Sequence, residues 1–175
     1  MRICMVSTDY LPSPGGVAAH VHGLSRGLRS LGHDVVVLTR AVEGFPAGCR
    51  EEAGVEVCRI SFPATTWSWR SRAAWTFMCT RRAPSWFLYR SAPLGSALIR
   101  LNHEATIDVV HVHTFDPDLL SAGWLSRAAS IFTNHTSMFI MSVDAGEGPT
   151  LRKKLHAYDR VLAPSTELAT LTAQT

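Results

Sequence analysis

The sequence predicts an α/β protein, in which a mostly parallel sheet is covered by helices on both faces. Short runs rich in Val and Ile recur along the chain with helical patterns between them, which is typical of parallel strands joined by helices. The chain has 175 residues, of which 46% are hydrophobic, and this suffices for one core and one domain. Charged residues make up only 18%, so the composition does not indicate disorder.

The first 40 residues predict one βαβ unit. A strand is expected at 2–7, and the loop after it contains two prolines and two glycines. Apolar residues then recur at steps of three and four, which predicts an amphipathic helix. These apolar residues are Val17, Val21, Leu24, Leu28 and Leu31. Gly32 stands where helices often end on a glycine, and 34–39 is expected to form the second strand.

The remaining elements follow the same alternation. A loop rich in Gly and Pro reaches about Ala53, and residues 67–105 favour helix with breaks at Pro84 and Pro93. A last helix is expected to begin near Ser165. Four further strands are expected, at 55–60, 108–113, 130–136 and 159–163.

Two polar features are expected to meet at one edge of this sheet. In a doubly wound sheet with strands ordered 3-2-1-4-5-6, the first and fourth strands are neighbours, and ligands bind at their carboxyl ends. Gly15 and Gly16 follow the first strand, and the fourth strand ends in His113. The sequence therefore predicts a ligand crevice between the glycine pair and this histidine.

The glycine pair fits an anion such as a phosphate. Gly15 and Gly16 allow the backbone to approach a ligand closely, and a helix N-terminus with free N–H groups follows them. The alternative is a tight turn that binds nothing. Neither of the common phosphate-binding glycine motifs is present, and the second strand ends in Thr39 and Arg40, where an NAD site needs an acidic residue. An ordinary NAD site is therefore disfavoured.

The position of each histidine on its strand or helix predicts a different role. His111 and His113 share one face of the fourth strand, and we expect His111 to be a hydrogen-bonded core residue and His113 to reach the ligand. His135 ends the fifth strand in a similar place. His20 and His22 lie two apart on a helix, so they diverge and do not form a metal pair.

Two alternatives to ligand contact remain. His111, His113, Asp116 and His135 superficially resemble the zinc cluster of a hydrolase, but further expected ligands are absent. Ser165 is either a helix N-cap or a ligand contact, and the two roles are compatible.

The chain resembles the retaining glycosyltransferases of the GT-B fold, in the large group called family 4. Within that group it is most similar to bacterial members such as the phosphatidylinositol mannosyltransferases. The resemblance covers nearly the whole chain, in the order of that family. It rests on the stretches 14–21, 31–39, 108–113, 133–137 and 159–165.

The resemblance implies an acceptor-side domain. Residues 1–175 would be the N-terminal Rossmann-like domain, and the C-terminal domain that binds the nucleotide sugar would be absent from this chain. Asp9, Tyr10, Gly15 and Gly16 would then lie by the donor and acceptor.

The resemblance also implies roles in the transfer. His113 would be the catalytic residue that contacts the donor sugar, and His135 and Ser165 would line the same donor and acceptor site. Transfer of a hexosyl group would retain configuration without a metal or a permanently bound cofactor, and the isolated domain would be inactive.

Two functions outside this scheme are kept as alternatives. One is a non-catalytic acceptor-binding subunit of a split glycosyltransferase, and the other is a metal-dependent hydrolase that uses the His-x-His pair. The gene beyond Thr175 separates the first alternative from a two-domain enzyme, and elemental analysis for zinc tests the second.

A basic and aromatic stretch indicates a membrane surface. No acidic residue occurs between Glu56 and Glu104, whereas seven arginines and four tryptophans do. Arg81, Arg82 and Trp86 suit anionic headgroups, which would make the acceptor a lipid or a lipid-linked glycan. The alternative is a packed aromatic face with solvated arginines.

The location expected from the sequence is cytoplasmic, at the inner face of a membrane. The apolar run at 3–6 is too short for a signal peptide, and no stretch has the length of a membrane span. The four cysteines are widely spaced, which argues against a metal knuckle or a dense disulfide framework. The net charge of +3 gives no reason to expect a nucleic acid partner.

Overall fold

The computed structural model describes residues 1–61, 85–114, 128–135 and 137–174, and within these ranges it is built on one sheet of seven strands. The order across the sheet is β3-β4-β2-β1-β5-β6-β7. The strands are β1 (Arg2–Val6), β2 (Asp34–Arg40), β3 (Gly48–Glu52), β4 (Val55–Ile60), β5 (Val109–Val112), β6 (Ala129–Thr133) and β7 (Arg160–Leu162).

The six predicted strands are all present, and their order confirms the predicted doubly wound sheet. All of them pair in parallel. The extra strand β3 lies at the edge and pairs antiparallel with β4, in a region that the sequence predicts as loop. Cys49 and Cys58 face each other across these two strands and form a disulfide, which the spacing of the cysteines did not predict.

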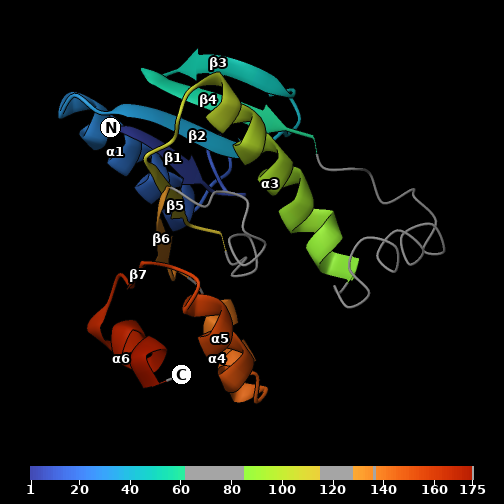
Figure 1. Cartoon of the computed structure of the whole chain (residues 1–175), viewed down its shortest axis with the longest axis vertical. Coiled ribbons are helices and arrows are strands. Elements are labelled where there is room, and N and C mark those ends of the chain that lie inside the picture. Colours follow the sequence, from blue (N-terminus) through green and yellow to red (C-terminus); the bar gives the residue numbers. More distant parts are fainter. Residues whose placement is uncertain (62–84, 115–127, 136, 175) are drawn as a thin grey trace.

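Helices cover both faces of the sheet, as predicted (Figure 1). One face is covered by α1 (Gly16–Ser30), and α3 (Ser85–Glu104), α4 (Ser137–Asp144) and α5 (Gly148–Leu155) lie on the other. Helices α4 and α5 were not predicted from the sequence. The final helix α6 (Thr166–Gln174) begins one residue after Ser165, as expected.

Helix α1 ends as the sequence predicts. Gly32 has φ 84° and donates its N–H to the carbonyl of Arg29, while His33 donates to the carbonyl of Leu28. This pair of hydrogen bonds satisfies two carbonyls at the end of the helix. The glycine is needed here because its positive φ is strained for residues with a Cβ.

The break predicted at Pro93 is wrong, because α3 continues through that residue. A proline removes one hydrogen bond from a helix, but packing of the following turns compensates for this loss. Leu94, Leu98 and Leu101 are fully buried against the sheet, in a cluster that includes Leu38 of β2. The expected break at Pro84 falls outside the described residues.

The two halves of the sheet are covered differently on the α1 side. Val35, Val37 and Val57, from β2 and β4, are fully buried beneath α1. The same face of β5, β6 and β7 is instead open to a cavity of about 470 Å³, whose lining is mainly apolar and includes Ile131 and Leu162. Helix α1 therefore covers only one half of this face of the sheet, and a groove lies beside the helix over the other half.

None of the helices in the described part of the chain has the length and apolar character required to cross a membrane.

Candidate functional site

The candidate site lies at the carboxyl ends of β1 and β5. These strands are neighbours and pair in parallel, with Met5 opposite His111. The N–H of His113 donates to the carbonyl of Val6 at 2.8 Å, which fixes the histidine backbone to the last residue of β1. The predicted meeting of the first and fourth strands is therefore confirmed.

The glycine pair opens α1 on this edge. Gly15 has φ 149° and ψ 157° and is the N-cap, and Gly16 is the first helical residue. A Cβ built on either glycine would have no atom within 4 Å, so the space in front of the turn is open. No side chain among the described residues caps the helix, and its first turn holds no acidic residue. The free N–H groups and the helix dipole therefore favour an anion here.

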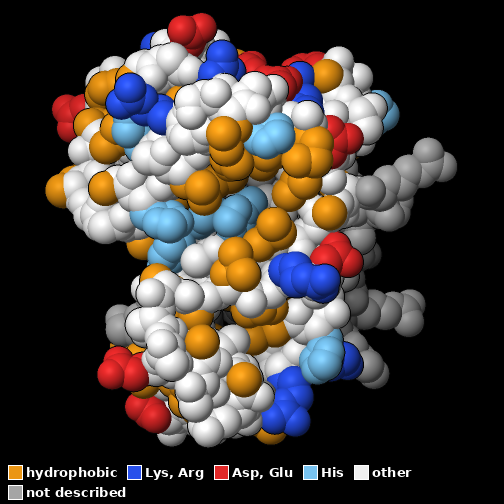
Figure 2. Space-filling model, turned by 90° about the vertical axis from the view of Figure 1, so that its left-hand side faces the viewer, with side chains coloured by type: hydrophobic (Ala, Val, Ile, Leu, Met, Phe, Trp, Pro, Cys, Tyr) orange, Lys and Arg blue, Asp and Glu red, His pale blue; other side chains and the backbone are white. Residues whose placement is uncertain are grey.

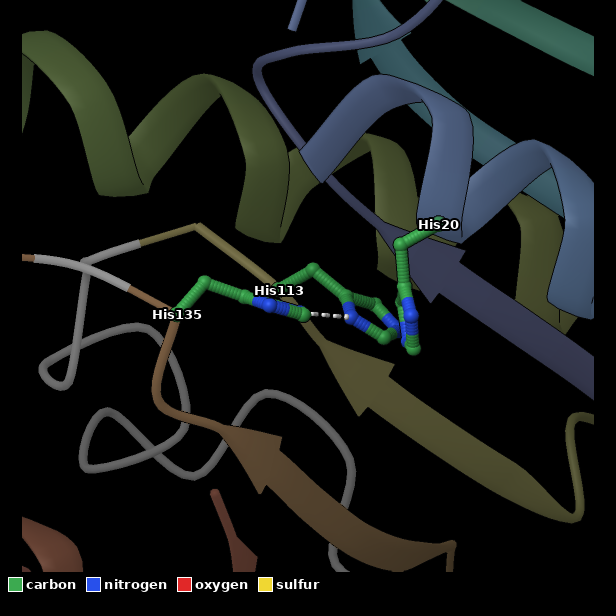
Figure 3. A group of neighbouring side chains, drawn as sticks. All are labelled: His20, His113 and His135. Atoms are coloured by element: carbon green, nitrogen blue, oxygen red, sulfur yellow. Dashed lines mark hydrogen bonds between the residues drawn. The ribbon is translucent and has the colours of Figure 1, made fainter. Parts of the chain in front are cut away.

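Three histidines from three elements meet at this edge of the sheet (Figure 3). His20 lies on α1, His113 follows β5 and His135 follows β6. Their ring centroids are 5.6 Å apart for His20 and His113, 4.8 Å for His20 and His135, and 5.3 Å for His113 and His135. Because His20 is one helical turn after Gly16, the cluster and the glycine turn share one edge of the sheet.

His113 is more enclosed than the sequence suggests. We expected it to be open to ligand, but only 1% of its surface is exposed. Its Nδ1 shares a 3.0 Å hydrogen bond with Nε2 of His135. Its Nε2 is buried and has no hydrogen-bond partner among the residues that the structure describes. Its two partners in the cluster are more accessible, because His20 is exposed and His135 is half-buried.

The buried imidazoles are neutral at physiological pH. Burial, followed by the nearby imidazoles of His111, His135 and His20, lowers the pKa of His113 to about 2. Burial also lowers the pKa of His111 to about 4, with His20 and His135 contributing. The pKa of His135 is lowered by burial and by His20. Neutral rings of this kind can donate and accept hydrogen bonds and can bind a metal ion.

His111 is a satisfied core histidine, as predicted. It is 7% exposed, and its Nε2 shares a 2.7 Å hydrogen bond with the hydroxyl of Thr133. The other alternative joined His111, His113 and His135 with Asp116, which lies outside the described residues. His111 does lie beside His113, with ring centroids 4.0 Å apart. The histidines whose nitrogens lie close enough together to hold a metal ion are His20, His113 and His135.

Asp9 and Tyr10, predicted to lie by the donor and acceptor, have contacts within the protein. The exposed carboxylate of Asp9 forms an ion pair with Arg40 at the end of β2. Tyr10 is 2% exposed and packs under α1, where its hydroxyl contacts Nδ1 of His22 at 3.0 Å. Neither residue is brought to the histidine cluster by a described contact.

Buried Arg59 holds the loop that leads to the glycine pair, and sequence reasoning did not identify it. Its guanidinium contacts both carboxylate oxygens of Glu52 and donates to the carbonyl of Leu11 at 2.8 Å. It also lies over the ring of Phe45, 4.9 Å from the centroid. The β3–β4 hairpin is thereby tied to the loop after β1.

Three further predictions concern residues away from the cluster. Ser165 is an N-cap, as expected, because its hydroxyl accepts the N–H of Leu168 at 3.2 Å. Arg81 and Arg82 lie outside the described residues. Trp86 belongs to α3, of which only the backbone is described at this position.

His20 was missed as a member of the site because its distance from His113 depends on the fold. The available signal was its position four residues after Gly16, one turn into the helix that starts at the predicted crevice. His20 and His111 also line the apolar groove beside α1. Figure 2 shows histidine side chains gathered beside hydrophobic ones on one face of the molecule.

Comparison with known proteins relates this chain to glycosyltransferases. The sequence model of Glycosyltransferase Family 4 matches residues 14–175. The alpha-monoglucosyldiacylglycerol synthase of Acholeplasma laidlawii is 30% identical over 147 residues, which are 78% of this chain and 30% of that protein. A glycogen synthase of Mycobacterium tuberculosis is 56% identical over 45 residues, or 25% of this chain and 11% of that protein. The chain thus spans about a third or less of these relatives.

The fold is also that of known structures. Sucrose-phosphate synthase from Thermosynechococcus elongatus aligns with a TM-score of 0.70 at 14% identity, over 99% of this chain and 44% of that one. An alpha,alpha-trehalose-phosphate synthase from Burkholderia xenovorans aligns with a TM-score of 0.56 at 15% identity, over 98% and 42%. The architecture is therefore a Rossmann-like α/β domain, as the sequence predicts.

Proposed function

We propose that this chain, which belongs to glycosyltransferase family 4, is the acceptor-side domain of an enzyme that transfers a hexosyl group from a nucleotide sugar. A second domain would bind the nucleotide. Configuration at the transferred carbon would be retained, and the transfer would need no metal and no permanently bound cofactor. This domain alone would be inactive, because the nucleotide would have no site.

One observation carries this proposal: the open N-terminus of α1 and the histidine cluster lie at the same edge of adjacent strands. His20 joins them, since it stands on the first turns of α1 and its ring lies 5.6 Å from that of His113. A topological switch point in an open α/β sheet is where ligands of this fold class bind.

The N-terminus of α1 and the histidine cluster suit opposite sides of the bond that breaks, between the sugar and the diphosphate. The N–H groups at Gly16 and the following residues favour the negative charge that develops on a leaving diphosphate. The neutral imidazole of His113 can hydrogen-bond a sugar hydroxyl or the sugar ring near the reacting carbon. Its low pKa makes it unsuited to act as a proton donor at neutral pH, so positioning and polarity are the roles that fit.

A lipid or lipid-linked glycan is the proposed acceptor. The name of the Acholeplasma relative describes synthesis of a monoglucosylated diacylglycerol, which is a glycolipid, and the apolar groove beside α1 borders His20 and His111. We propose further that Arg81, Arg82 and Trp86 contact the inner face of a membrane, which would place the protein in the cytoplasm. Vesicle binding that is unchanged after replacement of these three residues would contradict this part.

The test of the function is a screen of nucleotide sugars against the complete gene product, with lipid and glycan acceptors, and with the product linkage determined by NMR. We expect release of a nucleoside diphosphate and an anomeric configuration equal to that of the donor. His113→Asn should lower kcat at least about 100-fold, the loss typical of an electrostatic contact in the transition state. Inversion of configuration, or full activity of the variant, would contradict the proposal.

A further inference from the structure

The histidine cluster has the composition and arrangement of a transition-metal site. His20, His113 and His135 each offer one nitrogen, and these nitrogens lie within 4.8 Å of one another. The residues come from α1 and from the ends of β5 and β6, so only the folded chain brings them together (Figure 3). We propose that these three histidines bind one divalent transition-metal ion, of the kind that prefers imidazole, such as Zn²⁺, Co²⁺ or Ni²⁺.

The spacing of the rings agrees with a tetrahedral ion. With metal–nitrogen bonds of about 2.0 Å, two ligand nitrogens lie about 3.3 Å apart and their ring centroids about 5 Å apart. The three observed centroid distances run from 4.8 to 5.6 Å. The rings therefore have the required separation, and coordination needs them to turn so that one nitrogen of each faces a common point.

The side chains that must turn are the ones that are free to do so. His20 is exposed on α1 and His135 is half-buried, whereas His113 is held in the core at 1% exposure. Rotation of the two outer rings gives up one hydrogen bond, between Nδ1 of His113 and Nε2 of His135. A fourth coordination position would then face solvent on the side of His20.

The site is unsatisfied without an ion. His113 and His135 share one proton, and Nε2 of His113 is buried with no partner among the described residues. A buried nitrogen without a partner costs free energy, and neutral imidazole is the form in which histidine binds metal. The cluster has no carboxylate among the described residues, so it does not suit Mg²⁺ or Ca²⁺, which prefer oxygen ligands.

The consequence for transfer rests on the proposed function. An ion bound here occupies the imidazole of His113, which the proposed reaction needs for the sugar. The ion therefore acts as an inhibitor of the transferase and has no part in its chemistry. Binding of the ion itself does not depend on any activity, so the two statements are tested separately.

The binding test is a titration of the full chain with Co²⁺, without added reductant, followed by visible absorption. We expect one ion per chain with the d–d bands of a four-coordinate site and displacement by Zn²⁺. His20→Ala should lower the affinity by at least about tenfold, because even the loss of an outer partner of a metal ligand costs that much. His20 is exposed, so this change leaves the core intact.

Matched controls separate this site from others. His103→Ala removes an exposed histidine outside the cluster and should leave the affinity unchanged. Cys49, Glu56 and Cys58 form a second group of potential ligands when the disulfide is reduced, and coordination there would give sulfur-to-cobalt charge-transfer bands. Such bands, no binding, or equal effects of His20→Ala and His103→Ala would each overturn the proposal.

The activity arm uses the complete gene product. Zn²⁺ should inhibit transfer by the wild type, and His20→Ala should need at least about tenfold more Zn²⁺ for the same inhibition. Tight binding of Co²⁺ without inhibition by Zn²⁺ would support the metal site and contradict the proposed role of His113. Inhibition without a cobalt spectrum that depends on His20 would contradict the metal site alone.

Discussion

The two halves of the sheet are both built from parallel strands, but they differ in what covers them on the α1 side. In the covered half, formed by β4, β2 and β1, valines on the α1 side such as Val37 are fully buried. In the open half, formed by β5, β6 and β7, the same side carries Ile131 and Leu162 facing a groove, and it carries His111 in place of an apolar residue. The covered half is a structural core, and the open half combines apolar surface with the histidine cluster.

The covered half of the sheet contributes mainly to stability, and the open half carries the residues proposed to bind ligands. In the covered half, Arg59 and the β3–β4 hairpin hold the loop before the glycine turn, while His113 and His135 follow the ends of β5 and β6 in the open half. If this division is right, changes in the covered half should unfold the protein, whereas changes in the open half should leave the fold and alter binding.

The largest effect is expected for Arg59→Met in the covered half. The change leaves Glu52 and the carbonyl of Leu11 without a buried partner, and loss of one member of a buried ion pair costs about 3–5 kcal/mol. Arg160→Met, at an exposed position in the open half, is the control and should cost less than about 0.5 kcal/mol. Urea unfolding measures both, and equal effects would remove the distinction between the halves.

A pair of leucines on opposite faces of the sheet compares a residue packed against α3 in the covered half with one that lines the groove in the open half. Leu38 in β2 is fully buried, whereas Leu162 in β7 is 46% exposed. Leu38→Ala should lower the free energy of unfolding by about 2–4 kcal/mol through lost burial and a cavity, and Leu162→Ala by less than about 1 kcal/mol. A cost at Leu162 as large as that at Leu38 would show that the groove is covered in solution.

Acid should destabilise the protein through the histidine edge. The pKa values of His111 and His113 are lowered to about 4 and about 2 in the folded state, so below pH 6.5 the unfolded chain takes up protons that the folded chain does not. Each histidine therefore contributes stability above pH 6.5 that decreases as the pH falls, by about 2–3 kcal/mol down to pH 4.5.

The variant His113→Asn isolates this effect. It should show a shallower loss of stability between pH 7 and pH 4.5 than the wild type, measured by urea unfolding in the presence of EDTA. Parallel curves for the two proteins would mean that His113 is accessible to protons in the folded state.

The smallest effect is expected at the glycine turn. Gly15 has φ 149° and ψ 157°, a backbone region that residues with a Cβ avoid, so Gly15→Ala should cost about 1–3 kcal/mol. Gly16 is helical with open space around it, and Gly16→Ala should change stability by less than about 1 kcal/mol. Thermal unfolding of both variants checks the pair, and a reversed order would contradict the geometry of the turn.

The sequence predicted what local patterns determine. The strand order and the course of α1 follow from apolar periodicity, turn glycines and the handedness of βαβ units. Strand β3 was missed because its residues, Gly48–Glu52, include no large apolar side chain and are almost all exposed, so the strand is defined by pairing with β4 and not by a buried face. The continuity of α3 through Pro93 likewise depends on packing against the sheet.

Only part of the candidate site could be predicted, because only part of it is determined by local patterns and strand order. Gly15, Gly16 and His113 could be placed at one edge from topology alone, and His111 could be assigned to the core from its position on the strand. The contact of His20 with His113 and His135, and the resulting enclosure of His113, depend on side-chain packing between three elements. The spacing after Gly16 places His20 near the predicted crevice, but it does not give the contacts of His20 with residues of two other elements.

The most direct test of the account is NMR of the imidazole protons in the complete gene product during titration with a nucleotide sugar. The resonances of His20, His113 and His135, assigned from single substitutions, should shift together, while those of His103 and His156, which are exposed and are not members of the cluster, should not move. Shifts confined to histidines outside the cluster, at a concentration where transfer is saturated, would contradict the claim that the glycine turn and the three histidines form one site.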